Sequence, residues 1–151
     1  IQLFEEAISL ARQHGSAETP NYMGRLARVF AKKGQHQKAR TLIDDAWHVP
    51  LKEEIHDLEA SSAEVYQIIG EQDEAREYAV KAYKSAWSDG PPYVWWWDLE
   101  RAKAVLDALG EPYPEMPPFD PQKVGKFLYE DEVRAIIARE RAKRGIKADN
   151  E

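Results

Sequence analysis

Small and apolar residues recur along the chain at a fixed spacing of 36 positions. The recurring residues are Ala27, Phe30, Gly34, Ala39 and Ala46 in the first copy, and Ala63, Tyr66, Gly70, Ala75 and Ala82 in the second. In both copies seven positions lead from the first Ala to Gly, and twelve lead from the first Ala to the second. An internal period of roughly 20–50 residues is typical of proteins built from stacked repeats.

Each copy predicts two helices that meet at a turn. Gly34 and Gly70 stand where the first helix of each copy should end, because glycine adopts the left-handed conformation of a helix C-terminus without steric cost. Ala27 and Ala39 are small enough to let two backbones approach closely, and Phe30 lies on the same helical face as Ala27. A single pair of helices cannot bury its apolar face alone, so we expect neighbouring pairs to stack and share a core.

This pattern resembles the tetratricopeptide repeat. The residues on that family's positions are Leu26, Ala27, Phe30, Gly34, Ala39, Ile43 and Ala46 in the first copy, counted from Pro20, and Ala63, Tyr66, Gly70, Ala75, Ala79 and Ala82 in the second, counted from His56. The chain departs from the family in its period, which is 36 rather than about 34, and in lacking an early Trp in the first helix of each copy. The resemblance implies an all-α superhelix, or solenoid, of helical hairpins that binds proteins or peptides.

The repeat pattern extends on both sides of the two clear copies. We predict a repeat domain over residues 1–110 with about 2.5 hairpins: a half repeat at 2–14, repeats at 20–48 and 51–87, and a degenerate repeat at 91–110. Because the chain begins at Ile1, inside a helical pattern, we expect it to be a fragment of a longer protein.

A different pattern follows the repeats. Five prolines between Glu111 and Pro121 exclude helix there, so residues 111–129 are predicted to be an extended Pro-rich segment. Residues 130–151 are predicted to be a C-terminal helix and tail, with Val133, Ile136 and Ile137 as its apolar stripe.

Charge and composition narrow the classes of partner. Residues 51–120 carry six basic against sixteen acidic residues, a balance that argues against a nucleic-acid groove along the middle of the protein. The chain has no cysteine and no apolar run of about 18 residues that would span a membrane. We therefore expect a cytoplasmic protein with no membrane contact.

The resemblance places one candidate binding surface along the first helices of the repeats, where the family's concave groove lies. The residues carried over to this groove are Asn21, Arg28 and Lys32 from the first repeat, and Asp57, Glu64 and Gln67 from the second. Arg28 and Lys32 lie four apart on one face and are suited to holding a carboxylate or an acidic peptide. The alternative is a solvated face with local ion pairs to Glu64 or Asp57.

A second candidate surface is the aromatic patch formed by Tyr93, Trp95, Trp96 and Trp97. Three consecutive tryptophans point in three directions on a helix, so they cannot all face one core. One interpretation is that two of them pack between helices and one covers the Pro-rich segment. The alternative is an exposed anchor for a partner, because Trp and Tyr dominate such hot spots.

The sequence holds no catalytic or phosphate-binding motif. His48 and His56 stand near acidic residues but without the spacing of metal ligands, so we expect no metal site, no cofactor and no enzymatic activity. The leading hypothesis is a non-catalytic scaffold for protein–protein interaction, with a homodimer through an unfilled repeat end as a variant. Alternatives are the repeat-bearing sensor or regulatory region of a multidomain signalling ATPase or transcription regulator, and an RNA-binding helical repeat, which the acidic charge disfavours.

Overall fold

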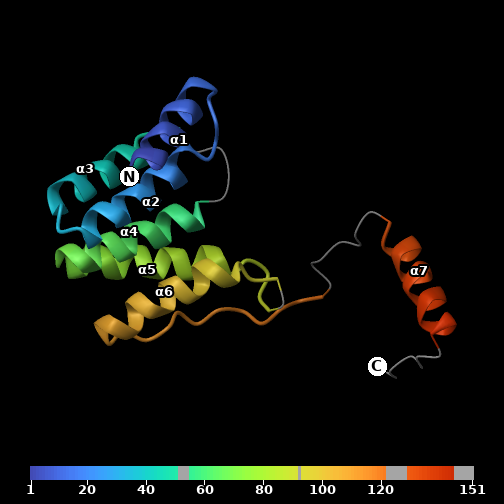
Figure 1. Cartoon of the computed structure of the whole chain (residues 1–151). Helices are drawn as coiled ribbons and strands as arrows, with labels where there is room; N and C mark the ends of the chain where they lie inside the picture. The colour runs from blue at the N-terminus through green and yellow to red at the C-terminus, as the bar shows by residue number, and fades with distance from the viewer. Residues whose placement is uncertain (51–54, 92, 122–128, 145–151) are drawn as a thin grey trace. The chain divides into compact units, whose positions relative to one another are not determined.

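The computed structural model describes residues 1–50, 55–91, 93–121 and 129–144. Across these ranges the chain forms helices and no strand, which confirms the predicted all-α class. The helices are α1 (Gln2–Gln13), α2 (Thr19–Lys32), α3 (His36–Trp47), α4 (His56–Ile69), α5 (Gln72–Trp87), α6 (Trp96–Leu109) and α7 (Glu130–Lys143) (Figure 1). The chain divides into two compact units, residues 1–119 and residues 120–151.

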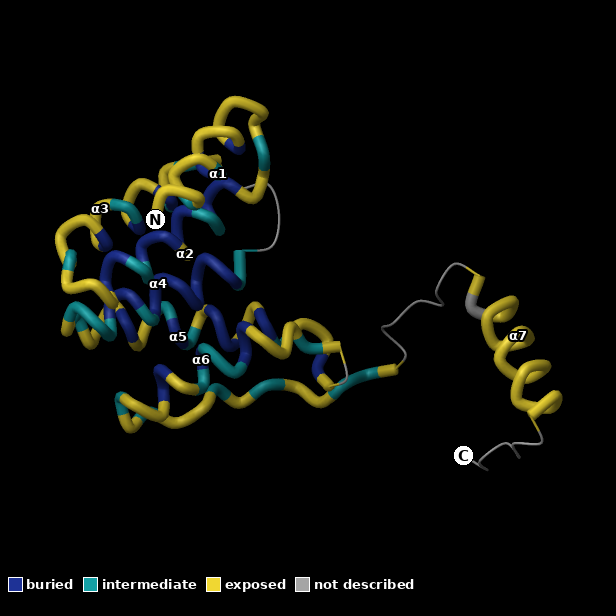
Figure 2. Tube along the Cα trace, in the orientation of Figure 1, coloured by how far each residue is buried: buried dark blue, intermediate teal, exposed yellow. Residues whose placement is uncertain are grey.

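Consecutive helices of the first unit pack against one another, and α2 and α4 also pack against the next helix but one. α2 contacts α3 and also α4, while α4 contacts α5 and also α6. α1 packs against α2. Buried positions gather on the facing sides of α2, α4, α5 and α6 (Figure 2).

The alanines of the repeated pattern lie where these helices meet. All six are completely buried: Ala27, Ala39, Ala46, Ala63, Ala75 and Ala82. Side chains of this size let the helix backbones approach, and larger residues such as Met23, Ile43 and Leu58 fill the space around them.

The turn after the first helix of each hairpin repeats the same geometry. Gly34 and Gly70 have φ angles of 73° and 90°, as predicted for glycines in the left-handed region. The amide of the residue after each glycine donates back to the carbonyl of the aromatic residue, from Gln35 to Phe30 and from Glu71 to Tyr66, both at 2.9 Å. This bond satisfies a carbonyl that the helix end leaves free.

The boundaries of two helices differ from the sequence-based expectation. The first helix of the second copy begins at His56 rather than near residue 51, and residues 51–54 lie outside the described ranges. α6 begins only at Trp96. Before it, the Tyr93 amide donates to the Gly90 carbonyl and the Trp95 amide donates to the Ala86 carbonyl.

Residues 111–119, which we call the strap, run in extended conformation beside α5 and α6 (Figure 1). The Trp87 indole N–H donates to the carbonyl of Pro117 at 3.0 Å. The strap is the first part of the Pro-rich segment that was predicted to be extended over residues 111–129. Residues 122–128 of that segment lie outside the described ranges.

The second unit contains α7. Val133, Ile136 and Ile137, the predicted apolar stripe, are each about half exposed. No helix in the described part of the chain is both long and apolar enough to cross a bilayer.

Candidate binding groove

Residues of α2, α4 and α6, together with the residues just before these helices, line a groove of about 810 Å³. Its lining includes Glu18, Asn21, Arg25, Arg28, His56, Asp57, Trp95, Trp97, Asp98 and Arg101. The helices that carry these residues are packed together: α4 contacts α2 on one side and α6 on the other.

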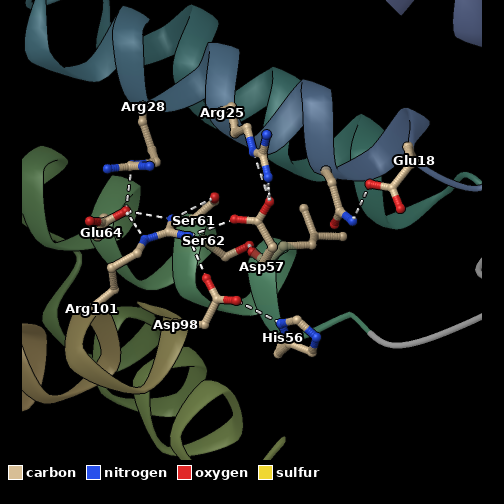
Figure 3. A network of polar contacts seen from close by, with 12 residues as sticks. Glu18, Arg25, Arg28, His56, Asp57, Ser61, Ser62, Glu64, Asp98 and Arg101 are labelled. Carbon is tan, nitrogen blue, oxygen red and sulfur yellow. Dashed lines mark hydrogen bonds and ion pairs between the residues drawn. The ribbon is translucent and has the colours of Figure 1, made fainter. Parts of the chain in front are cut away.

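Arg101 of α6 joins the acidic side chains on the floor of the groove (Figure 3). Its Nη1 lies 2.6 Å from Asp57 Oδ1 and 2.8 Å from Asp98 Oδ1. Its Nη2 lies 2.7 Å from Glu64 Oε2 and donates to Ser61 Oγ at 2.8 Å. The planar guanidinium presents five N–H donors in a fixed fork, and a fork of this kind can serve several acceptors at once.

Two arginines of α2 reach the same acids from the opposite side. Arg25 donates from Nε to Asp57 Oδ2 at 2.8 Å, and Arg28 forms an ion pair with Glu64. Within the described residues, the network therefore joins Arg25, Arg28 and Arg101 to Asp57, Glu64 and Asp98, and their formal charges cancel.

The pKa values of Arg101 and Arg28 are shifted in opposite directions, although Glu64 and Asp57 act to raise both. Burial alone would lower the pKa of Arg101, but its hydrogen bonds and charge interactions with Glu64 and Asp57 outweigh burial and raise it. Burial and the neighbouring Arg101 lower the pKa of Arg28. The positive charge of Arg101 is thus stabilised more strongly than that of Arg28, because Arg101 lies between three carboxylates.

His56 extends the network to the aromatic edge of the groove. Its Nδ1 lies 2.7 Å from Asp98 Oδ2, and its ring stacks on Trp95 with the centroids 4.5 Å apart. Burial would raise the pKa of Asp98, but the hydrogen bond with His56 and the charge of Arg101 outweigh it and lower this pKa. Asp98 therefore connects Arg101 to His56, and His56 in turn stacks on the Trp95 ring.

All three tryptophans of the aromatic patch are exposed, to 47%, 60% and 77% for Trp95, Trp96 and Trp97. The interpretation that two of them pack between helices is wrong. The run occupies the N-cap and first turn of α6, whereas the buried face of that helix begins at Asp98 and Leu99.

The tryptophans differ in what they face. Trp95 and Trp97 line the groove. Trp96 does not: the Lys103 ammonium lies 5.7 Å from its ring centroid, on the same helix. Tyr93 lies beside Phe119 of the strap, with the ring centroids 5.2 Å apart.

The structure brings together part of the groove set predicted from the sequence. Asn21, Arg28 and Asp57 line the groove, and Glu64 joins its floor through Arg28 and Arg101. Lys32 is exposed at the last position of α2, Gln67 is half-buried near the end of α4, and neither lines the groove. Arg28 is paired with Glu64 rather than held ready, together with Lys32, for a partner's carboxylate.

Sequence reasoning missed Arg25, His56, Asp98 and Arg101 as members of this site. Groove positions were carried over to the two clear copies only, and α6 belongs to the degenerate third copy. The signal in that copy was the pair Asp98 and Arg101, which lie three residues apart and therefore share a helical face.

The two histidines weighed as metal ligands have separate partners. His48 Nδ1 lies 2.6 Å from the Asp44 carbonyl oxygen, and His56 contacts Asp98. Over the described ranges, no three His, Cys, Asp or Glu side chains are grouped so as to hold a metal ion.

Comparisons with protein-family models, with curated proteins and with solved structures find no match to this chain.

Proposed function

We propose that residues 1–119 are a tetratricopeptide-like stack of helical hairpins that binds a peptide segment of a partner protein in the groove between α2, α4 and α6. It acts by binding rather than by catalysis, and the lack of cysteine favours a cytoplasmic setting. The doubled pattern of alanine and glycine supports the stack, as do the contacts of α4 with both α2 and α6.

One observation carries the proposal: two exposed indole rings stand at the edge of a groove large enough for side chains of a ligand. A volume of about 810 Å³ falls within the roughly 300–1,000 Å³ of ligand pockets. Tryptophan is enriched among the residues that contribute most binding energy at interfaces. An exposed Trp97 beside a hollow is therefore suited to anchor an incoming side chain.

The charged floor favours one class of peptide. Arg28 and Arg101 already face carboxylates at ion-pair distance, so an acidic ligand would have to compete with partners that are in place. The groove instead suits a segment that presents an apolar or aromatic side chain to Trp95 and Trp97. Asn21, which donates to Glu18, and the half-exposed Arg25, which is paired with Asp57, lie at the rim, where their exposed polar atoms can also contact the ligand backbone.

The test is a selection of random twelve-residue peptides displayed on phage against the immobilised full chain, followed by titration of the enriched peptides. We expect enriched peptides to contain an aromatic or large aliphatic residue. Trp97→Ala should weaken their binding at least tenfold, because it removes an anchor from the groove.

Trp96→Ala is the matched control. It removes the same side chain from the neighbouring position, which does not line the groove, and it should change the affinity less than twofold. Failure to enrich any peptide, or equal losses from the two substitutions, would overturn the proposal.

A further inference from the structure

A ladder of three aromatic residues holds the strap against the first unit. Tyr83, Trp87 and Tyr93 form this ladder, which lies apart from the lining of the groove. Tyr83 stacks on Tyr113 with centroids 5.7 Å apart, Trp87 donates its indole N–H to Pro117, and Tyr93 packs against Phe119. Each member of the ladder therefore contacts a different residue of the strap.

This is the chemistry by which proteins recognise extended Pro-rich peptides. Such a peptide has no internal hydrogen bonds, so its carbonyls are free to accept from the receptor, and its rigid backbone loses little entropy on docking. The receptor offers aromatic rings as the walls and a side-chain N–H as the donor. The ladder provides both.

The strap covers this surface but is nowhere fully buried, although Met116 packs against the core. None of residues 111–119, all of which are described, is buried, whereas Tyr83 beneath them is only 5% exposed. Gly90 allows the close passage of the chain: a Cβ placed there would lie 3.1 Å from both the Phe119 amide nitrogen and Trp87 Nε1. The surface is thus shaped for an extended segment, and none of the described strap residues 111–119 is fully buried on it.

We propose that the aromatic ladder is a binding site for extended Pro-rich segments, filled in this chain by its own strap and open to a partner's segment when the strap leaves. The partner segment is one in which an aromatic residue stands between prolines, as Tyr113 does in the strap. This site is separate from the groove and does not depend on the groove's function.

The covalent link gives the strap an advantage over a free peptide. A tethered segment has an effective concentration on the order of millimolar, so a partner peptide binds measurably only when the strap is weakened or the partner is itself held nearby. A test must therefore weaken the strap while leaving the ladder intact.

The experiment uses the full chain and a fluorescently labelled synthetic peptide with the sequence of residues 110–120. The double substitution Tyr113→Ala with Phe119→Ala removes the ring contacts with Tyr83 and Tyr93 and the hydrogen bond from Tyr113 to Asp107, and it leaves the side chains of the ladder unchanged. We expect this variant to bind the peptide at least tenfold more tightly than the unsubstituted chain. Adding Trp87→Phe, which keeps a ring and removes the N–H donor, should weaken that binding at least fivefold.

Two controls separate this site from the groove and from unspecific attraction. A peptide with alanine at the positions of Pro114, Pro117 and Pro118 should not bind. Trp97→Ala, in the groove, should leave binding of the strap peptide unchanged. The proposals for the groove and for the ladder are therefore tested independently.

The proposal is overturned if the strap-weakened chain binds no peptide, if the unsubstituted chain binds equally well, or if Trp87→Phe has no effect. Circular dichroism reports whether the double variant folds. If it does not, the unsubstituted chain is titrated with millimolar peptide while the Trp87 indole N–H is followed by NMR. A saturating shift of that signal supports the ladder site, and an unchanged signal refutes it.

Discussion

Arg101 Nη1 and Asp57 Oδ1 lie 2.6 Å apart, although 44 residues of chain separate them. The contact joins α6 to α4, and Arg25 on the far side of Asp57 joins α4 to α2. The two side chains of the Arg101–Asp57 pair are only 11% and 9% exposed. A pair so placed fixes the relative positions of the helices that line the groove, and it does so at the cost of removing charges from water.

Replacing Arg101 by methionine should destabilise the chain by about 3–5 kcal/mol, because it leaves the carboxylates of Asp57, Glu64 and Asp98 without their common partner. Urea denaturation measures the loss. Arg76→Met is the control, because Arg76 pairs with Asp73 and Glu111 at the surface, where solvent screens ion pairs and they contribute little to stability. Similar losses from both variants would contradict the role assigned to Arg101.

Gly24→Ala tests the close approach of α2 and α4. Alanine in a helix interior is favoured over glycine by about 1 kcal/mol, but a Cβ at position 24 would lie 3.0 Å from Ser61 Cβ and 3.2 Å from Leu58 Cδ1. Overpacking of this kind costs about 1–3 kcal/mol, so the free energy of unfolding should fall despite the better propensity.

A double-mutant cycle with Ser61→Gly provides the control for Gly24→Ala. Removing the Ser61 Cβ removes the nearest obstacle, so Gly24→Ala should be less costly in that background. Additive effects of the two substitutions would show that the helices adjust independently of this contact.

Glu59 should make the protein less stable as the pH rises. Burial raises its pKa above the usual value near 4.5, against the opposing hydrogen bond from Ser85. The native state then favours the protonated carboxyl, so its contribution is fully present below the usual pKa and is lost as the pH rises through the raised one. Glu59→Gln should increase the free energy of unfolding at pH 7 and flatten its decline between pH 4 and 7. Glu74→Gln, at an exposed position, is the control, and an equal gain from it would contradict the prediction.

Asp98 should have the opposite pH dependence. Its pKa is lowered because His56 and Arg101 outweigh the effect of burial, so its contribution is present above the usual value near 3.8 and is lost as the pH falls through the lowered one. Asp98→Asn should lower stability at pH 7 and lessen the further loss on acidification. Chemical denaturation between pH 2 and 7 measures both effects, and an unchanged acid limb would contradict the assignment.

The sequence predicted the helices better than it predicted the site, for a physical reason. The spacing of Ala27, Gly34 and Ala39 reports on helices adjacent in the chain, whose contacts depend on local periodicity. The floor of the groove instead depends on α2, α4 and α6 meeting, which places Arg25, Asp57 and Arg101 within reach of one another. No local sequence pattern predicts that Arg101 will form ion pairs with three carboxylates.

The three consecutive tryptophans show a second limit of prediction from the sequence. Periodicity indicated correctly that three consecutive indoles cannot share one face, but their exposure depends on where the helix begins. Because α6 starts at Trp96, the run falls on its first turn rather than along its buried face. The hydrogen bonds from Tyr93 to Gly90 and from Trp95 to Ala86 hold the chain just before that start, and composition did not predict them.

The most direct test of the groove is a two-dimensional NMR titration of the indole N–H signals, of which the five tryptophans provide one each. Trp95 and Trp97 line the groove, Trp96 stands outside it, and Trp47 donates to Ser62 in the interior. On addition of a peptide selected for binding, we predict saturating shifts for Trp95 and Trp97 that exceed those of Trp96 and Trp47. Shifts confined to Trp96, or spread evenly over all five signals, would contradict a binding site in the groove.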